Sequence, residues 1–257
     1  MTMSFNAPSL VLGYDLDKWN NYGGIKEPIT IDISPSTNSH ILLCGMSGAG
    51  KSYDEHQLVY RLALAEQKLG GEYLFADYKG DDTFSYLKDC PRFFPYKAAF
   101  AALDTVHARL IARQSGEDTS RYPITLIWDE YMAATLNLIS EDKKAATTAM
   151  SKVSEILQLG RSLSVRLVSV CQRPDALAFP AGSRLNYGVI IVVGAAVRSI
   201  YEMLLPDHME QVKGRQFGQG EGVVLLQGSE LRFIKVPTVR NENRMKQACL
   251  KALSRPL

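Results

Sequence analysis

The segment ILLCGMSGAGKS, which starts at Ile41, constrains the possible folds of this chain more than any other segment. An apolar strand leads into a glycine-rich turn and a long pattern of helical spacing, as a phosphate-binding loop requires. The glycines let backbone N–H groups point at phosphate oxygens, and the start of the helix adds a positive dipole end. The segment therefore predicts a site for a nucleoside triphosphate, formed by Gly45, Met46, Ser47, Gly48, Ala49, Gly50, Lys51, Ser52 and Tyr53.

Three further side chains suggest what the nucleotide is used for. In this kind of loop Lys51 reaches the β- and γ-phosphates, and the Ser52 hydroxyl binds Mg²⁺. The apolar strand ITLIWDE ends in Asp129 and Glu130, and because the chain turns there, both carboxylates can face the phosphates. We expect Asp129 to help hold Mg²⁺ and Glu130 to act as the general base on water, which favours hydrolysis of ATP. Another strand, VRLVSVCQ, ends in Gln172, whose amide could hydrogen-bond the γ-phosphate or the water.

The remaining pattern predicts one α/β domain. The 257 residues are 46% hydrophobic, which suffices for one large core. Strands and helices alternate, which argues for a mostly parallel sheet with helices on both faces and small β additions at each end. We expect short strands and turns in 1–38, including a strand SLVLGYDLD, the core in 39–236, and a basic helical tail in 237–257. Within the core, the pattern predicts helices at about Lys51–Leu69, Ala98–Gln114 and Lys143–Gly160, and a hairpin with its turn at Gln227–Glu230.

Composition excludes several classes of protein. The net charge of +2 permits nucleic-acid binding without requiring it. The 4 cysteines form no CxxC pair and no Cys/His cluster, which argues against a zinc site. There is no apolar run of the roughly 20 residues that a bilayer span needs, and no secretion signal at the start. We therefore expect a cytoplasmic protein with no membrane segment of its own.

Taken together, the motifs resemble the FtsK/SpoIIIE family of DNA-translocating ATPases, within the FtsK–HerA group of P-loop ATPases. HILLCGMSGAGKS is similar to the first motif of that family, and LIWDEYMA looks like its second nucleotide motif. LFADYKG resembles its second-strand motif at Asp77 and Lys79. The most specific match is ILQLGRSLSVRLVSVCQRPDA, which places Gly160, Arg161, Gln172, Arg173 and Pro174 on the family pattern.

The resemblance implies a RecA-like core that assembles as a ring, usually a hexamer, with ATP bound between subunits. It also implies that Gln172 senses the γ-phosphate. A neighbour's arginine would complete each site by stabilising transition-state charge. The candidates are Arg161, Arg184 and Arg198. Arg198 lies where the family carries an Asp-Ser-Arg motif, but here Ala196 and Val197 precede it.

The favoured function is an ATP-driven translocase of double-stranded DNA, similar to the compact motors of conjugative elements, plasmids and phages. Its DNA contacts should be mostly to phosphates. Candidates, which could also form a plain solvated face, are Lys213, Arg215, Arg240, Arg244, Lys246 and Lys251. A separate partner could supply membrane anchoring or DNA specificity, and the segment FFPY could either face a partner or pack in the core. Three alternatives stay open: an ATPase of type VII protein secretion, an ATP-dependent scaffold, and a small-molecule kinase.

Overall fold

A ten-stranded sheet forms the centre of the protein, with strand order β2-β1-β10-β9-β8-β3-β7-β6-β4-β5. The computed structural model describes residues 9–34, 37, 39–46, 48–67, 70–236 and 239–256. The strands from β8 to β5 in that order run parallel to one another, and β9, β10, β1 and β2 are each antiparallel to their neighbours. The strands are β1 (Ser9–Asp15), β2 (Pro28–Asp32), β3 (Ile41–Gly45), β4 (Glu72–Asp77), β5 (Phe93–Pro95), β6 (Ile124–Asp129), β7 (Val165–Cys171), β8 (Val189–Val193), β9 (Glu221–Leu226) and β10 (Glu230–Lys235).

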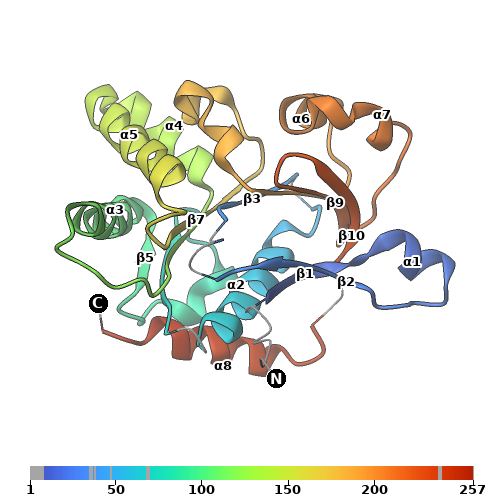
Figure 1. Ribbon diagram of the computed structural model, residues 1–257, viewed down its shortest axis with the longest axis horizontal. Helices are drawn as coiled ribbons and strands as arrows, with labels where there is room; N and C mark the ends of the chain where they lie inside the picture. Colours follow the sequence, from blue (N-terminus) through green and yellow to red (C-terminus); the bar gives the residue numbers. More distant parts are fainter. Residues whose placement is uncertain are drawn as a thin grey trace, which may run out of the picture.

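Helices cover both faces of the sheet, so the predicted fold class is confirmed (Figure 1). In β3, Leu42 and Cys44 join a core with α3, α4 and α5, whereas Ile41 and Leu43 join a second core with α2 and α8. This split follows from the alternation of side chains along a strand. Among the described residues, no helix is both long and apolar enough to cross a membrane. The helices are α1 (Leu16–Asn21), α2 (Lys51–Gln67), α3 (Ala99–Ser115), α4 (Tyr131–Glu141), α5 (Lys143–Leu159), α6 (Arg198–Leu204), α7 (Met209–Val212) and α8 (Glu242–Leu253).

The N-terminal segment differs from the prediction of short strands and turns alone. The strand predicted over SLVLGYDLD ends at Asp15, and helix α1 begins at Leu16. The Asp15 side chain accepts a hydrogen bond from the Lys18 amide at 2.9 Å, which caps the helix and ends the strand. Because β1 pairs with β10, this segment extends the central sheet.

A second helix that the sequence did not predict, α4, follows Glu130 directly. The predicted helix from Lys143 is present as α5, and Asp142 caps it by accepting from the amides of Lys144 and Ala145. The predicted hairpin is present as β9 and β10, and its turn contains Gln227 and Gly228, both with positive φ. In FFPY, Phe93 is buried in edge strand β5, while Tyr96 is 49% exposed, so this segment packs only in part.

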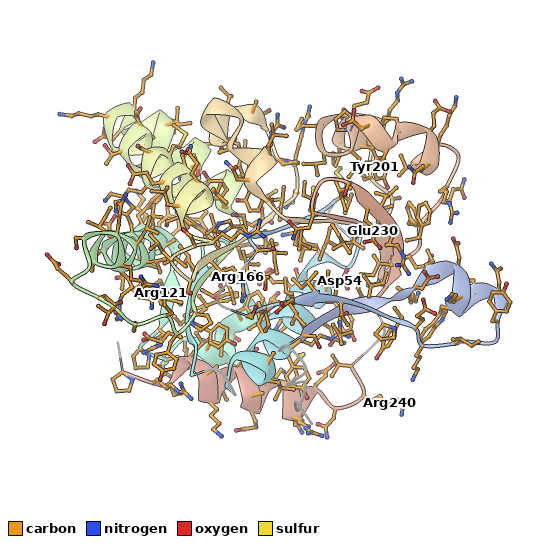
Figure 2. The ribbon with its side chains drawn as sticks, viewed as in Figure 1. Asp54, Arg121, Arg166, Tyr201, Glu230 and Arg240 are labelled. Atoms are coloured by element: carbon orange, nitrogen blue, oxygen red, sulfur yellow. The ribbon has the colours of Figure 1, made fainter. Side chains whose placement is uncertain are left out.

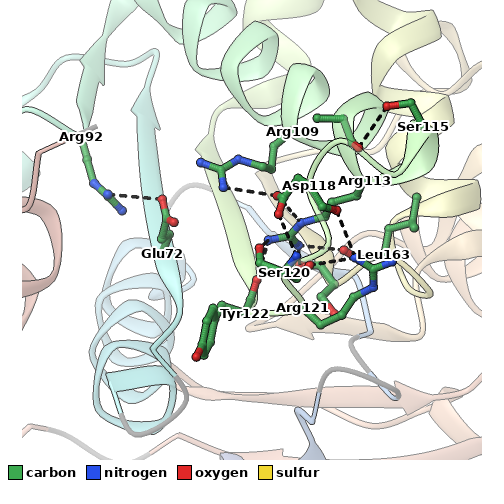
Figure 3. Close-up of polar contacts among 12 residues, drawn as sticks. Glu72, Arg92, Arg109, Arg113, Ser115, Asp118, Ser120, Arg121, Tyr122 and Leu163 are labelled. Carbon is green, nitrogen blue, oxygen red and sulfur yellow. Dashed lines mark hydrogen bonds and ion pairs between the residues drawn. The ribbon is translucent and has the colours of Figure 1, made fainter.

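A buried arginine joins the elements at the edge of the sheet where β6 and β7 begin (Figure 3). Arg113 of α3 is only 3% exposed, and its guanidinium donates to the carbonyl oxygens of Tyr122, Leu163 and Ser164 at 2.8, 2.8 and 3.0 Å. Its Nε also donates to Asp118 at 3.0 Å. The arginine thus ties α3 to the segments that enter both strands.

Candidate active site

The predicted nucleotide loop lies at the edge where the parallel strands end. Strand β7 pairs with β3 on one side and with β6 on the other. The loop after β3, the acidic pair at the end of β6 and Gln172 after β7 are therefore neighbours. Ligands of open α/β sheets bind at this edge, beyond the carboxyl ends of the strands.

Lys51 connects the loop to the acidic pair. Its Nζ donates to Glu130 Oε1 at 2.7 Å and lies 3.3 Å from Asp129 Oδ1. All three side chains are at least nine-tenths buried. Burial lowers the pKa of Lys51, but Asp129 and Glu130 outweigh it and hold that pKa above its usual value. Lys51 is therefore a buried cation that two carboxylates keep charged.

The backbone of Glu130 explains how successive carboxylates reach the same site. Glu130 has φ of 51°, a left-handed conformation that is costly for a residue other than glycine and that often marks a functional site. It lies between the last residue of β6 and the first residue of α4. Its amide donates to Asp129 Oδ1 at 2.9 Å. This turn brings both carboxylates to Lys51.

Gln172 also belongs to this cluster. Its Nε2 donates to Glu130 Oε1 at 3.1 Å, so the same carboxylate oxygen accepts from Lys51 and from Gln172. The contact holds Glu130 in one orientation between the loop and the end of β7. We call Lys51, Asp129, Glu130 and Gln172 the polar cluster.

Glu55 is a member of the site that sequence reasoning missed. Its carboxylate is fully buried, and no donor among the described residues reaches either oxygen. Burial raises the pKa of Glu55 well above its usual value, and the nearby Asp129 adds to the rise. A protonated Glu55 can donate to Asp129. The signal in the sequence is its position four residues after Lys51, which puts both side chains on one helix face.

The loop itself fits a bound phosphate group. Gly50 has φ of 91°, a conformation that would strain a larger residue, and a Cβ on Gly45 would come within 2.7 Å of Val193 Cγ2. The first N–H groups of α2 have no intrahelical acceptors and can bind an anion. Gly48, Ala49 and the other loop residues surround this helix start, except Ser47, which lies outside the described residues. Tyr53 is half-buried, and its hydroxyl accepts from Gln57 at 3.0 Å.

The residues also fit a magnesium ion that takes part of its coordination from phosphate. Ser52 and Asp129 carry side-chain oxygen atoms, the type of ligand that Mg²⁺ prefers. In the described part of the chain, no group of three or more His, Cys, Asp or Glu could hold a metal. An ion here would need further ligands from a nucleotide and water, which is how Mg²⁺ usually binds at such sites. Burial raises the pKa of Asp129, although Lys51 opposes the rise.

The other predicted residues lie farther from the cluster or face solvent. Arg161 is exposed and lies between α5 and β7, at the opposite edge of the sheet. Arg198 begins α6 with 84% of its side chain exposed and pairs with Glu202 at 2.7 Å. Arg184 donates to the Pro174 carbonyl at 3.0 Å. Within one subunit, none of these three arginines joins the polar cluster.

The two residues of the second-strand motif, Asp77 and Lys79, lie in different environments. Asp77 ends β4 in register with Asp129 and is buried, and it accepts from the Gly80 amide at 2.9 Å. Lys79 has 45% of its side chain exposed and pairs with Asp81. Asp77 therefore shapes the turn beside the acidic pair, while Lys79 faces outward.

Solved structures share this fold, although no protein-family model and no curated protein matches the sequence. The cytoplasmic domain of the type VII secretion ATPase EccC from Thermomonospora curvata is 19% identical, with a TM-score of 0.68 over 98% of this chain and 32% of that one. The pCW3 conjugation coupling protein TcpA, in a monomer form with ATPγS, is 18% identical, with a TM-score of 0.71 over 96% of this chain and 71% of that one.

A shorter viral protein shares part of the same fold. The genome packaging NTPase B204 from Sulfolobus turreted icosahedral virus 2, in complex with AMPPCP, is 15% identical, with a TM-score of 0.50 over 77% of this chain and 98% of that one. At these identities the likeness concerns the fold. The chain has the mostly parallel, RecA-like P-loop α/β fold that the family resemblance implied.

Proposed function

We propose that this protein is an FtsK-like ATPase that uses ATP hydrolysis to move along double-stranded DNA. The observation that carries the proposal is the polar cluster, in which Lys51, Asp129 and Glu130 meet beside the phosphate-binding loop. A kinase must exclude water from the γ-phosphate, whereas in the proposed reaction the Glu130 carboxylate would activate a water. The shared fold with TcpA, EccC and B204 supports a nucleotide-hydrolysing role.

The residues of the site divide the work of hydrolysis. The loop amides and Lys51 would bind the phosphates of ATP, and Lys51 would then exchange part of its contact with the carboxylates for contact with phosphate. Ser52 and Asp129 would hold Mg²⁺, which neutralises charge on the β- and γ-phosphates. Glu130 would orient a water and accept its proton as that water attacks the γ-phosphate. Gln172 would hold Glu130 in position and sense the γ-phosphate.

We propose duplex DNA as the substrate of the motor and a hexameric ring as its working form. TcpA is a conjugation coupling protein and B204 a genome packaging NTPase, and both names describe handling of genetic material. In a ring, a neighbour's arginine would complete each site, and Arg198 supports this role because it projects into solvent at the edge where the cluster lies. The protein would act in the cytoplasm, with a separate partner for membrane contact or DNA specificity.

A second candidate function is a role in protein secretion. EccC and the ATPase domains of EssC from Geobacillus thermodenitrificans share the fold over 98% and 96% of this chain. Such an ATPase would have the same polar cluster and would respond to a peptide instead of DNA. An ATP-dependent scaffold would bind nucleotide and assemble without stimulation by either polymer.

The test is the steady-state ATPase rate with and without long double-stranded DNA, with Glu130→Gln as the blank. We expect strong stimulation by the duplex in the wild type and no turnover above background in the variant. The variant should still bind ATP, because Lys51 and the loop are intact. Full ATP binding with no response to duplex would contradict the DNA motor. Stimulation by peptide would instead favour the secretion role.

A further inference from the structure

A hollow of about 330 Å³ lies where α2 and the start of α8 meet, and it shares no residue with the nucleotide loop. We call it the α2–α8 notch. None of the described residues that line it is acidic. Its lining includes four cations and two tyrosines from three distant parts of the sequence, namely Tyr14, Lys26, Tyr60, Arg61, Arg240 and Arg244.

Three of the four cations are free to bind a ligand. Lys26, Arg240 and Arg244 are exposed, and in the part of the chain that the structure describes no carboxylate pairs with them. The Lys26 ammonium lies over the Trp19 ring, 6.0 Å from the ring centroid. Figure 2 shows Arg240 at the lower right edge of the view, near the start of α8 and away from the body of the fold. Their charge is therefore directed to solvent rather than balanced within the protein.

Arg61 forms the fixed inner part of the notch. Its Nη1 donates to the carbonyl oxygens of Val11 and Leu12 at 3.0 and 2.8 Å, which holds the half-buried guanidinium in place. Burial lowers the pKa of Arg61, so an anion in the notch would stabilise the charge. The buried Asp54 acts electrostatically on Arg61, and Glu242 is exposed at the start of α8. The described lining itself holds four cations and no acidic side chain, so the charge of the lining is positive.

We infer that the α2–α8 notch binds the backbone phosphates of a nucleic acid. Arginines hold phosphate oxygens through paired N–H donors, and tyrosines offer hydroxyl donors or a face for a base. Apart from Val239, the described lining is polar, charged or a tyrosine, which does not suit a membrane surface where apolar side chains must insert. The inference rests on the proposed function for the identity of the polymer.

The position of the notch links it to the nucleotide site. Helix α2 carries Lys51 at its first residue and Arg61 on the wall of the notch. Ten residues of helix separate them, which is about 15 Å at the usual rise. A polymer held in the notch therefore contacts the same rigid helix that presents Lys51 to phosphate.

The test measures binding of a short fluorescent duplex by anisotropy between about 0.05 and 0.2 M salt. The variant is Arg240→Gln with Arg244→Gln, and its matched control is Lys143→Gln with Lys144→Gln on α5, which removes the same charge from exposed positions. For two lost phosphate contacts we expect about tenfold or more weaker binding at 0.1 M salt in the notch variant. The slope of log K against log salt should also become shallower by about 2. The control should bind as the wild type does.

A second variant separates the notch from a general effect of the basic tail. Lys26→Gln removes a cation that is distant in sequence from α8, and Lys88→Gln, at an exposed position, is its control. We expect Lys26→Gln to reduce the salt slope by about 0.9, as one phosphate contact should. Equal losses in the notch variants and their controls would overturn the inference.

Further measurements distinguish nucleic acid from other phosphate-bearing ligands, and distinguish failure of the notch inference from failure of the proposed function. Competition by inorganic phosphate at the same phosphate concentration, or tighter binding to phosphatidylserine vesicles than to the duplex, would overturn the inference. The notch variants could bind duplex as the wild type does, while duplex still stimulates the ATPase. That result would overturn the inference about the notch but not the proposed function. A wild type that neither binds duplex nor responds to it would overturn both.

Discussion

At the scale of single residues, Glu130 is the centre of the site. One of its oxygens accepts from Lys51 and from Gln172, and its left-handed backbone sets its direction. A general base must be held within hydrogen-bond reach of the water that it activates. The surrounding contacts therefore matter because they position this carboxylate, and Gln172 can be tested separately from it.

We predict that Gln172→Ala lowers the ATPase rate by on the order of 10- to 100-fold, because a misplaced catalytic group costs about that much. ATP affinity should change little, since Lys51 and the loop remain. Gln158→Ala is the matched control, because Gln158 lies exposed on α5 and bonds only to Ser154 among the described contacts. Equal rates for the two variants would show that Gln172 does not position Glu130.

His40 gives a prediction on pH and stability. It is fully buried beside the charges of Arg166 and Arg161, and burial first, then these charges, lowers the pKa of His40 to about 3. Its Nδ1 accepts from the Leu167 amide at 3.0 Å, so the neutral ring is required. Below the usual pKa of 6.5 the unfolded chain binds a proton that the folded protein excludes, so stability falls as the pH drops from about 6.5 toward 3.

From pH 7 to pH 5, this histidine should remove about 2 kcal/mol of unfolding free energy. His40→Asn keeps an acceptor for Leu167 but does not titrate, so its stability should decline less over that range. Urea unfolding of both proteins at the two pH values measures the difference. Parallel pH profiles would contradict the assignment.

At the scale of elements, strand order decides which loops meet. Because β7 lies between β3 and β6, the residue after β7 reaches the groups after both neighbours. At the opposite edge, Arg113 fixes α3 to the segments that enter β6 and β7. One edge of the sheet therefore holds the candidate active site, whereas the contacts of Arg113 stabilise the opposite edge.

Loss of the Arg113 contacts should lower the free energy of unfolding. Arg113→Met removes donors from three carbonyl groups, so we expect the unfolding free energy to fall by about 2 to 4 kcal/mol. Arg109→Met is the control, because 40% of the Arg109 side chain is exposed and its contact with Asp118 is a single 3.3 Å pair. That variant should lose less than about 1 kcal/mol. Urea unfolding measures the stability of both variants. Equal losses of unfolding free energy would contradict a structural role for the buried Arg113 contacts.

At the scale of the whole molecule, helix α8 covers α2 and ties the end of the described chain to the sheet. Met245, Cys249 and Leu253 are buried, and Cys249 and Leu253 belong to the second core. Arg92 donates through Nε to the carbonyl oxygen of Arg255 at 3.1 Å. The same packing forms one wall of the α2–α8 notch. The C-terminal helix is therefore an integral part of the structure.

Leu253→Ala should lower the unfolding free energy by about 2 to 4 kcal/mol, because Leu253 is 1% exposed and its loss leaves a cavity. Leu185→Ala makes the same change at a side chain that is 90% exposed and should cost less than about 0.5 kcal/mol. Thermal or urea unfolding distinguishes the two. A small loss at Leu253 would mean that α8 packs only weakly on α2.

Features that depend on residues adjacent in the chain could be predicted from local pattern alone. Glycine spacing predicts the phosphate loop, apolar runs predict the buried strands, and strand–helix alternation predicts the parallel sheet. Even the end-of-strand positions of Asp129 and Gln172 follow from local pattern. The helices α1 and α4 were missed because capping and turn geometry at Asp15 and Glu130 decided where they begin.

Long-range packing determines which of these local features meet in space. Strand order put Gln172 next to Glu130, and packing of α2 buried Glu55 beside Asp129, because hydrogen bonding and burial depend on neighbours in space. The α2–α8 notch is the clearest case, since it joins Lys26, Arg61 and Arg244 across most of the chain. Local pattern determines the secondary structure that each segment favours, whereas long-range packing determines which charged side chains line the same hollow.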